Sequence, residues 1–454
     1  MYPRLLRGVS EIMKKKRIKL NSFQIIVFGF LGLILTGALL LMLPAASRDG
    51  RPAGPMTALF TSTSAVCVTG LVVRNTATAW SFFGQLIILL LIQIGGMGVV
   101  LVASVLAMLT HRKISLMQRS TMQDALSAPQ VGGIVRLARF ILKFVIAAET
   151  AGALALMPVF IRDYGILHGI WFSVFHSISA FCNAGFDLLG IRTPYCSLTG
   201  YAADPLVNIT IMGLIVTGGL GFLTWNDILN HRFRFHQYRM QTKVVLTATA
   251  LLILLPAVYF YFGEYAYLPA KSRLAAALFQ SVTPRTAGFN TTDLTKLSDT
   301  GVFITIMLML IGGAPGSTAG GMKVSTFAVV LLTVAATLRQ DRETRCFGRR
   351  IDDSVLRQAV SILFLYVTLF LFGGFIISRA ESLPLLPCLF ETASAIGTVG
   401  LTLGITPQLH TLSRLILIAL MYAGRVGGLT LIFAAFPHMQ HISSRYVREH
   451  ITVG

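Results

Sequence analysis

Eight long apolar runs constrain this chain more than any other feature of its sequence. Each has roughly the 20 residues that a helix needs to cross the hydrocarbon core of a bilayer. Only 12% of the 454 residues are charged, whereas a soluble domain carries about 25%. The sequence therefore predicts an all-α polytopic membrane protein. The predicted spans are 23–43, 82–109, 140–160, 206–229, 244–262, 302–338, 360–377 and 412–436.

The basic residues are distributed unevenly along the chain. It carries 38 Lys and Arg against 18 Asp and Glu, which gives a formal net charge of +20. Of these 38, 25 lie at the termini or in the connections after the second, fourth and sixth spans. This is the positive-inside pattern, and it predicts that both termini are cytoplasmic. The excess charge is then explained by topology and by attraction to anionic membrane lipids, so we expect no nucleic acid as a partner.

Between the spans of each successive pair lies a shorter semi-apolar stretch that is too brief to cross a membrane. Its four copies align, because each begins with Phe, continues with a Ser/Thr-rich turn and closes on Gly before a large apolar residue. Ordinary extracellular turns are the alternative interpretation, but they do not repeat one pattern four times. The first Phe and the closing Gly of the copies are Phe60 and Gly70, Phe175 and Gly185, Phe279 and Gly288, and Phe390 and Gly400.

These copies predict four fused helix–pore-helix/loop–helix repeats, with eight spanning helices and four re-entrant pore loops in fourfold pseudo-symmetry around one pore. The connectors between the repeats are basic. The predicted divisions are a cytoplasmic N-terminus at 1–22, pore repeats at 23–110, 137–230, 244–338 and 355–436, and a cytoplasmic C-terminal tail at 437–454.

The four closing glycines suit a pathway for cations. An ion that leaves water needs oxygen ligands, and backbone carbonyls supply them in K⁺ filters. Glycine adopts unusual backbone conformations at low cost, so four loops with one glycine each can direct rings of carbonyls at one axis. The Ser/Thr-rich segments are interpreted as half-length pore helices. If their C-terminal ends point at the axis, their dipoles favour a cation there.

The four loops resemble those of the Trk/Ktr/HKT superfamily of potassium transporters. The length, short N-terminus and eight-span layout are most similar to the bacterial Ktr membrane subunit type, KtrB. In this family a glycine in all four loops implies preference for K⁺, whereas a serine in the first loop accompanies Na⁺ permeation. The resemblance implies a filter, with K⁺ at its carbonyls, made of Val68, Thr69, Gly70, Asn183, Ala184, Gly185, Thr286, Ala287, Gly288, Thr398, Val399 and Gly400.

The third loop departs from the others, because it is one residue shorter and carries Pro284 and Arg285. A positive charge beside a cation filter is unexpected. Arg285 could instead point away and brace the loop through backbone or carboxylate partners. The same Thr-Pro-Arg-Thr-Ala-Gly-Phe run occurs in Ktr sequences, so we predict a structural role.

The sixth apolar run is too long for one crossing and is interrupted at 312–321. Five glycines and a proline in ten residues strongly disfavour a continuous helix. The resemblance implies that this intramembrane loop lies below the filter as its gate. A helix kink is the alternative, and the order of residues does not fit a phosphate-binding loop. The predicted gate residues are Gly312, Gly313, Ala314, Pro315, Gly316, Ser317, Thr318, Ala319, Gly320, Gly321, Lys323 and Arg425.

Two of these gate residues are cations inside predicted spans. An intramembrane charge is a functional hypothesis by default. The resemblance implies that Arg425 faces the pore below the filter, opposite the gate loop, as an electrostatic barrier. The alternative is a buried ion pair with Glu149 or Glu391. Lys323 interacts with the gate or extends to the lipid headgroups.

The family resemblance implies a K⁺ uptake subunit of a bacterial plasma (inner) membrane that conducts like a channel. It also implies Na⁺ activation, a homodimer and a cytosolic octameric regulatory ring of the KtrA type. The nucleotide, ATP/ADP or NAD(H), is expected on that partner, and this chain is expected to have no intrinsic cofactor and no enzymatic activity. A Trk-type subunit is the alternative within the family. Outside it, an alternating-access cation symporter would require paired broken helices in two inverted halves, whereas the sequence indicates one break.

Overall fold

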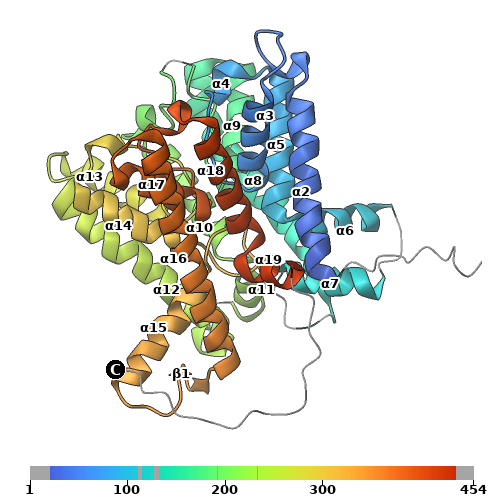
Figure 1. Cartoon of the computed structure of the whole chain (residues 1–454), viewed down its shortest axis with the longest axis vertical. Helices are drawn as coiled ribbons and strands as arrows, with labels where there is room; N and C mark the ends of the chain where they lie inside the picture. The colour runs from blue at the N-terminus through green and yellow to red at the C-terminus, as the bar shows by residue number, and fades with distance from the viewer. Residues whose placement is uncertain are drawn as a thin grey trace, which may run out of the picture.

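The computed structural model describes residues 21–110, 115–126, 130, 132–191, 193–232 and 234–435. The predicted cytoplasmic N-terminus, apart from its last two residues, and the predicted C-terminal tail lie outside the described residues. The described part is mostly helical, with connecting loops and one antiparallel hairpin of two strands, β1 (Arg345–Cys346) and β2 (Arg349–Arg350) (Figure 1).

Four helices are long and apolar enough to cross a membrane unbroken. The first of them begins at a capping signal in the sequence. In the first, the Asn21 side chain accepts from the Gln24 amide, and the Gln24 side chain accepts from the Asn21 amide, which forms a capping box. The four are α2 (Ser22–Leu41), α8 (Ile134–Tyr164), α12 (Met240–Tyr259, continued by a π-helical turn, Phe260–Glu264) and α16 (Asp353–Glu381).

Each long helix is followed by a shorter helix and a loop. The shorter helices are α3 (Pro55–Val66), α9 (Ile166–Phe181), α13 (Ala270–Val282) and α17 (Leu385–Ile396). The remaining helices are α4 (Thr76–Ala79), α5 (Phe82–Met97), α6 (Val99–Leu109), α7 (Leu116–Leu126), α10 (Pro205–Gly219), α11 (Phe222–His231), α14 (Asp299–Leu310), α15 (Val324–Leu338), α18 (Thr411–Val426) and α19 (Gly428–Ala435).

Three predicted spans that we expected to be continuous are sharply bent, so the prediction of a single interrupted span is wrong. The angles are 94° between α5 and α6, 96° between α10 and α11, and 92° between α18 and α19. Each bend contains a glycine with a φ of +85° to +92°, at Gly98, Gly221 and Gly427. L-residues rarely adopt this conformation, so the helix ends there. Hydropathy misses such bends because the residues on both sides stay apolar.

Besides a buried apolar core, the structure exposes large apolar side chains and buries hydroxyl groups. Large apolar side chains are exposed on the long helices, for example Leu39 and Phe364, whereas hydroxyl groups of the short helices, such as those of Ser64 and Ser179, are fully buried. Contiguous exposed apolar surface indicates a membrane or partner environment. The described residues therefore have the pattern of a multi-pass membrane protein.

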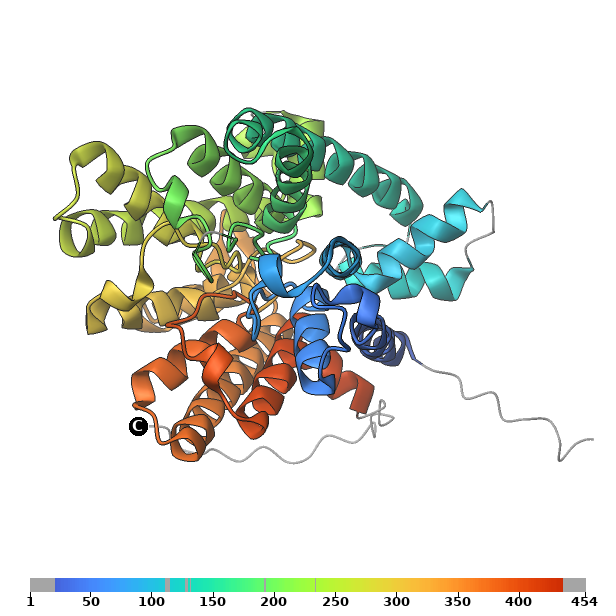
Figure 2. The same ribbon diagram turned by 90° about the horizontal axis from the view of Figure 1, so that it is seen from above.

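The short helices occupy the interior, and their packing closes on itself. Each contacts the long helix before it and the helix after its loop, in the third group through the Gln280 and Thr305 side chains of α13 and α14. Contacts also pass from one group to the next, from α5 to α9, from α10 to α13, from α14 to α17, and from α18 back to α3. Figure 2, seen from above, shows the loops gathered near the centre with helices around them. This packing brings four distant loops to one place.

Candidate ion pathway

The four loops share an unusual backbone conformation. Each closing glycine has positive φ, and so does the residue two positions before it. Those earlier residues are Val68, Asn183, Thr286 and Thr398, with φ of +50°, +57°, +71° and +50°. Three of the four are β-branched, for which positive φ is a genuine outlier that costs about 1–3 kcal/mol. Backbone strain repeated at equivalent positions is typical of a functional site.

The same loops form a closed ring of close backbone contacts. A Cβ added to Gly70 would lie 2.5 Å from the carbonyl oxygen of Ala184, and one added to Gly185 would lie 2.7 Å from that of Ala287. The corresponding distance is 2.4 Å between Gly288 and Val399 and 2.1 Å between Gly400 and Thr69. Each glycine thus lies against the middle carbonyl of the next loop, and a side chain would not fit.

Hydroxyl groups of the short helices brace the loops from behind. The Gly70 and Gly400 amides donate to the Ser64 and Ser394 hydroxyls, at 3.0 Å in both cases. In the other two loops the direction is reversed. The Ser179 hydroxyl donates to the Phe186 carbonyl at 2.8 Å, and the Thr283 hydroxyl donates to the Phe289 carbonyl. The sequence indicated a Ser/Thr-rich turn but did not identify these hydroxyls as loop supports.

The segment between α14 and α15 lies directly against this ring. A Cβ added to Gly320 would overlap the Thr398 hydroxyl at 2.2 Å, and one added to Gly312 would lie 3.4 Å from the Thr286 methyl. The segment is folded back on itself, since the Gly312 amide donates to the Met322 carbonyl at 2.7 Å. The predicted gate loop is therefore adjacent to two loops of the ring.

Backbone hydrogen bonds attach the gate loop to two of the bent helices. The Ala314 amide donates to the Gly219 carbonyl at 2.8 Å, and the Gly321 amide donates to the Gly424 carbonyl at 3.1 Å. The Thr318 hydroxyl reaches the Phe181 carbonyl, at the C-terminal end of α9, at 3.0 Å. The acceptors lie at helix ends, where carbonyls lack partners within the helix. The bends therefore supply attachment points for the loop.

Arg425 joins the gate loop to the end of α5. Its guanidinium donates to the carbonyl of Thr318 in the loop and to those of Gly95 and Gly96. The last two are carbonyls near the C-terminus of a helix, where the dipole favours a cation. Among the described residues Arg425 forms no ion pair, so the carboxylate pairing that we weighed is wrong.

Lys323, at the end of the gate loop, also bonds to backbone oxygens. Its Nζ donates to the carbonyls of Ala319 at 2.7 Å and Gly320 at 3.3 Å. The alternatives for Lys323 were interaction with the predicted gate loop and extension to the lipid headgroups. The geometry matches the first. These bonds hold the loop residues that are nearest to Thr398.

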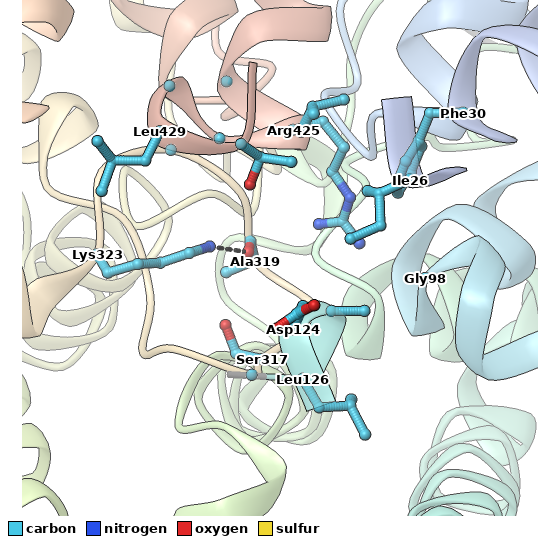
Figure 3. Close-up of a pocket in the computed structure, with 18 of the residues that line it drawn as sticks. Ile26, Phe30, Gly98, Asp124, Leu126, Ser317, Ala319, Lys323, Arg425 and Leu429 are labelled. Atoms are coloured by element: carbon cyan, nitrogen blue, oxygen red, sulfur yellow. Dashed lines mark hydrogen bonds between the residues drawn. The ribbon is translucent and has the colours of Figure 1, made fainter. Parts of the chain in front are cut away.

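A cavity of about 280 Å³ lies below the gate loop. Figure 3 shows Arg425 and Lys323 entering it from two sides, with Asp124 and Ser317 below them. Asp124 belongs to α7, whose last residue, Leu126, has its carbonyl 2.8 Å from the position of an added Cβ on Gly316. The ring of loops therefore contacts the gate loop, and the gate loop in turn borders this cavity.

A family model described as TrkH, a cation transport protein, matches residues 10–446. The chain belongs to this family of cation transport proteins. It is 39% identical over 455 residues to the potassium/sodium uptake protein NtpJ of Enterococcus hirae, which covers 98% of this chain and all of that one. It is 38% identical over 452 residues to the Ktr system potassium uptake protein B of Bacillus subtilis, with the same coverage. The predicted family is thus confirmed, and it is a family of transporters rather than enzymes.

A solved structure agrees on the fold. The potassium transporter TrkH of Vibrio parahaemolyticus superposes with a TM-score of 0.74 over 93% of this chain and 86% of that one. The sequences are 20% identical, so this match concerns the fold alone.

Arg285 is buried behind the third loop. Its Nη2 donates to the Thr249 hydroxyl at 3.3 Å, and its Nε has no partner among the described residues. We expected backbone or carboxylate partners for Arg285. The observed partner is instead the hydroxyl group of Thr249 on α12. The side chain does face away from the ring, toward a small cavity that Thr249 and Gly313 also line.

The sequence contains a signal for the bends that hydropathy does not report. The bend glycines follow another glycine by three residues, in Gly95–Gly98, Gly218–Gly221 and Gly424–Gly427. The first glycine of each set packs on the last turn of a short helix, with an added Cβ at 2.0–2.1 Å from the carbonyls of Val66, Phe181 and Ile396. The three-residue spacing thus places a closely packed glycine just before the glycine at which the helix ends.

Proposed function

We propose that this chain is the K⁺-conducting membrane subunit of a Ktr-type uptake system. The observation that carries the proposal is the closed ring of four glycine loops, in which each glycine lies against a carbonyl of the next loop. Rings of backbone carbonyls replace the hydration shell of K⁺. The names of the two relatives, a potassium/sodium and a potassium uptake protein, agree with this substrate.

In this proposal the three residues that end on each glycine form the filter, and the four loop-bearing units are pseudo-equivalent repeats around one pore. The support is the packing order of the helices, which runs through the units in sequence and closes on itself. The breaks in the second helices follow successive loops along the chain instead of recurring in two inverted halves. This arrangement favours a channel-like pore over an alternating-access symporter.

The gate in this proposal is the loop at 312–321, held closed by Arg425 and Lys323. The hydrogen bonds from Arg425 to the loop and to α5 support it, since they connect a fixed helix end to the segment that lies against the ring. The guanidinium also places a positive charge at the cavity, where it opposes the passage of a cation.

The proposal for assembly and orientation rests on the family. We propose a homodimer with both termini in the cytoplasm of a bacterial cell, operated by a cytosolic nucleotide-binding ring and activated by Na⁺. The name of the Bacillus subtilis relative, a component of a Ktr system, supports partner subunits. The transmembrane potential, worth about 2.3 kcal/mol per charge per 100 mV, drives accumulation.

Selectivity tests the proposal. We would measure ⁸⁶Rb⁺ and ²²Na⁺ influx into proteoliposomes for the wild type and for Gly70→Ser. The wild type should prefer Rb⁺, and the variant should lose much of that preference because its side chain meets the Ala184 carbonyl. Gly54→Ser is the matched control, since an added Cβ there meets no atom within 4 Å. Unchanged selectivity in a folded Gly70→Ser protein would refute the filter assignment.

A further inference from the structure

An apolar groove of about 530 Å³ runs along the outside of the protein between α12 and α15. One wall is formed by α12 from Val244 to Pro256, and the other by α15 from Phe327 to Leu332. Its hydroxyl group, on Thr247, bonds to the backbone of its own helix at 2.8 Å. Leu255 and Leu331 expose 66% and 51% of their surface along it. Apart from the thiol of Cys346, the groove thus offers only hydrocarbon to an occupant.

The length of the groove matches one leaflet of a membrane. The twelve-residue separation between Val244 and Pro256 corresponds to about 18 Å along the helix axis. Half of a hydrocarbon core is about 15 Å thick. The α12 wall of the groove is therefore long enough for an acyl chain of one leaflet.

The hairpin of β1 and β2 lies at the Val244 end of the groove, which Cys346 and Phe347 line. Figure 1 shows this hairpin at the lower end of α15. The Phe347 ring also contacts the ring of Phe235, in the connection between α11 and α12, with centroids 6.1 Å apart. The mouth of the groove is thus built by two connections that the positive-inside pattern assigns to the cytoplasmic side.

Cations surround this mouth. The Lys243 ammonium lies 5.8 Å from the centroids of both the Phe235 and Phe347 rings. It donates one hydrogen bond, to the His236 carbonyl at 2.9 Å. The ammonium has three N–H donors, so it can donate further hydrogen bonds to a ligand. Arg349 is exposed on the hairpin, and among the described residues neither it nor Lys243 forms an ion pair.

We propose that this groove is a binding site for an anionic phospholipid of the cytoplasmic leaflet. One acyl chain lies between α12 and α15, and the phosphate of the headgroup lies at the mouth, near Lys243 and Arg349. Charge complementarity selects this occupant over a neutral lipid, because the mouth offers unpaired cations directly above an apolar groove. A second copy of the chain fits less well, since a twofold interface joins the same patch on both subunits and would bring two basic mouths together.

Native mass spectrometry tests the site on the full chain, purified and exchanged into detergent with either phosphatidylglycerol or phosphatidylcholine of equal chain length. We expect the wild type to retain one phosphatidylglycerol per chain and to lose phosphatidylcholine. The double variant Lys243→Gln, Arg349→Gln removes the headgroup contacts, and Ala328→Phe fills the groove. Each should lower retention by about tenfold. Arg119→Gln and Ala147→Phe, single substitutions of the same kinds at exposed positions on α7 and α8, should retain the lipid.

The readout is binding, so it stands apart from transport activity. Equal retention of the two lipids by the wild type would overturn the proposal, as would full retention by both groove variants. Dissociation of a dimer by Ala328→Phe, with lipid retention unchanged, would assign the groove to a second copy instead.

Discussion

Substitution of Arg425 by Gln should open the proposed gate in the absence of a regulator. The guanidinium holds the gate loop through the Thr318 carbonyl and is itself held by the carbonyls of Gly95 and Gly96. A hydrogen bond from a charged group contributes about 1.5–3 kcal/mol net. If the bond to Thr318 is made only in the closed state, its loss shifts the opening equilibrium by about 10- to 150-fold.

The fold should survive this change. The carbonyls that lose their donor lie beside a cavity of about 280 Å³, where water can replace the guanidinium. The assay is ⁸⁶Rb⁺ influx into proteoliposomes that contain this chain alone. Arg425→Lys is the matched variant, because it keeps the charge at the cavity but cannot make the same forked contacts. Equal flux in wild type and Arg425→Gln would refute the gate reasoning, and a rise in Gln but not in Lys would attribute the closed state to charge.

Three further predictions concern the ring and the gate loop. Gly400→Ala should abolish ⁸⁶Rb⁺ flux, because its Cβ would overlap a carbonyl at 2.1 Å, whereas Gly404→Ala, which has similar φ but open space around it, should stay within about twofold of wild-type flux. Ser64→Ala should lower stability by about 1–3 kcal/mol in thermal unfolding, since a buried amide loses its acceptor. The buried Ser173, which bonds within its own helix, provides the control, and an equal loss in Ser173→Ala would contradict the bracing role. Lys323→Met should raise regulator-free flux by less than Arg425→Gln does, and no rise would remove Lys323 from the closed gate.

The positions of the loops could be predicted from the sequence because the same pattern occurs four times. Phe60 and its three counterparts begin the shared pattern and are fully or almost fully buried, and the closing glycines meet at one ring. A pattern of this kind reflects two local requirements of the structure. One is a buried aromatic side chain, and the other is a backbone conformation that favours glycine. Both needs are satisfied within about ten residues, so the sequence carries them directly.

The partners of the two intramembrane cations could not be predicted in the same way. Arg425 bonds to carbonyls of α5 and of the gate loop, which are far away in the sequence. Those of Gly95 and Gly96 are available because α5 ends at Met97, where the chain bends. Hydropathy does not indicate this bend, so it does not indicate these carbonyl acceptors either, and a carboxylate remains as the expected partner. One error in a helix end thus propagated to the site.

The direction of the hydroxyl bonds shows why a repeated sequence need not give a symmetric site. All four short helices place a hydroxyl four residues after the Phe, at Ser64, Ser179, Thr283 and Ser394. Ser or Thr can donate or accept, so the sequence does not distinguish the two directions. In the structure the first and fourth hydroxyls accept from a glycine amide, and the second and third donate to a carbonyl. The first and fourth loops are neighbours in the ring, as are the second and third. The supports therefore divide the ring into two halves, and the gate loop contacts one loop of each half, at Thr286 and Thr398.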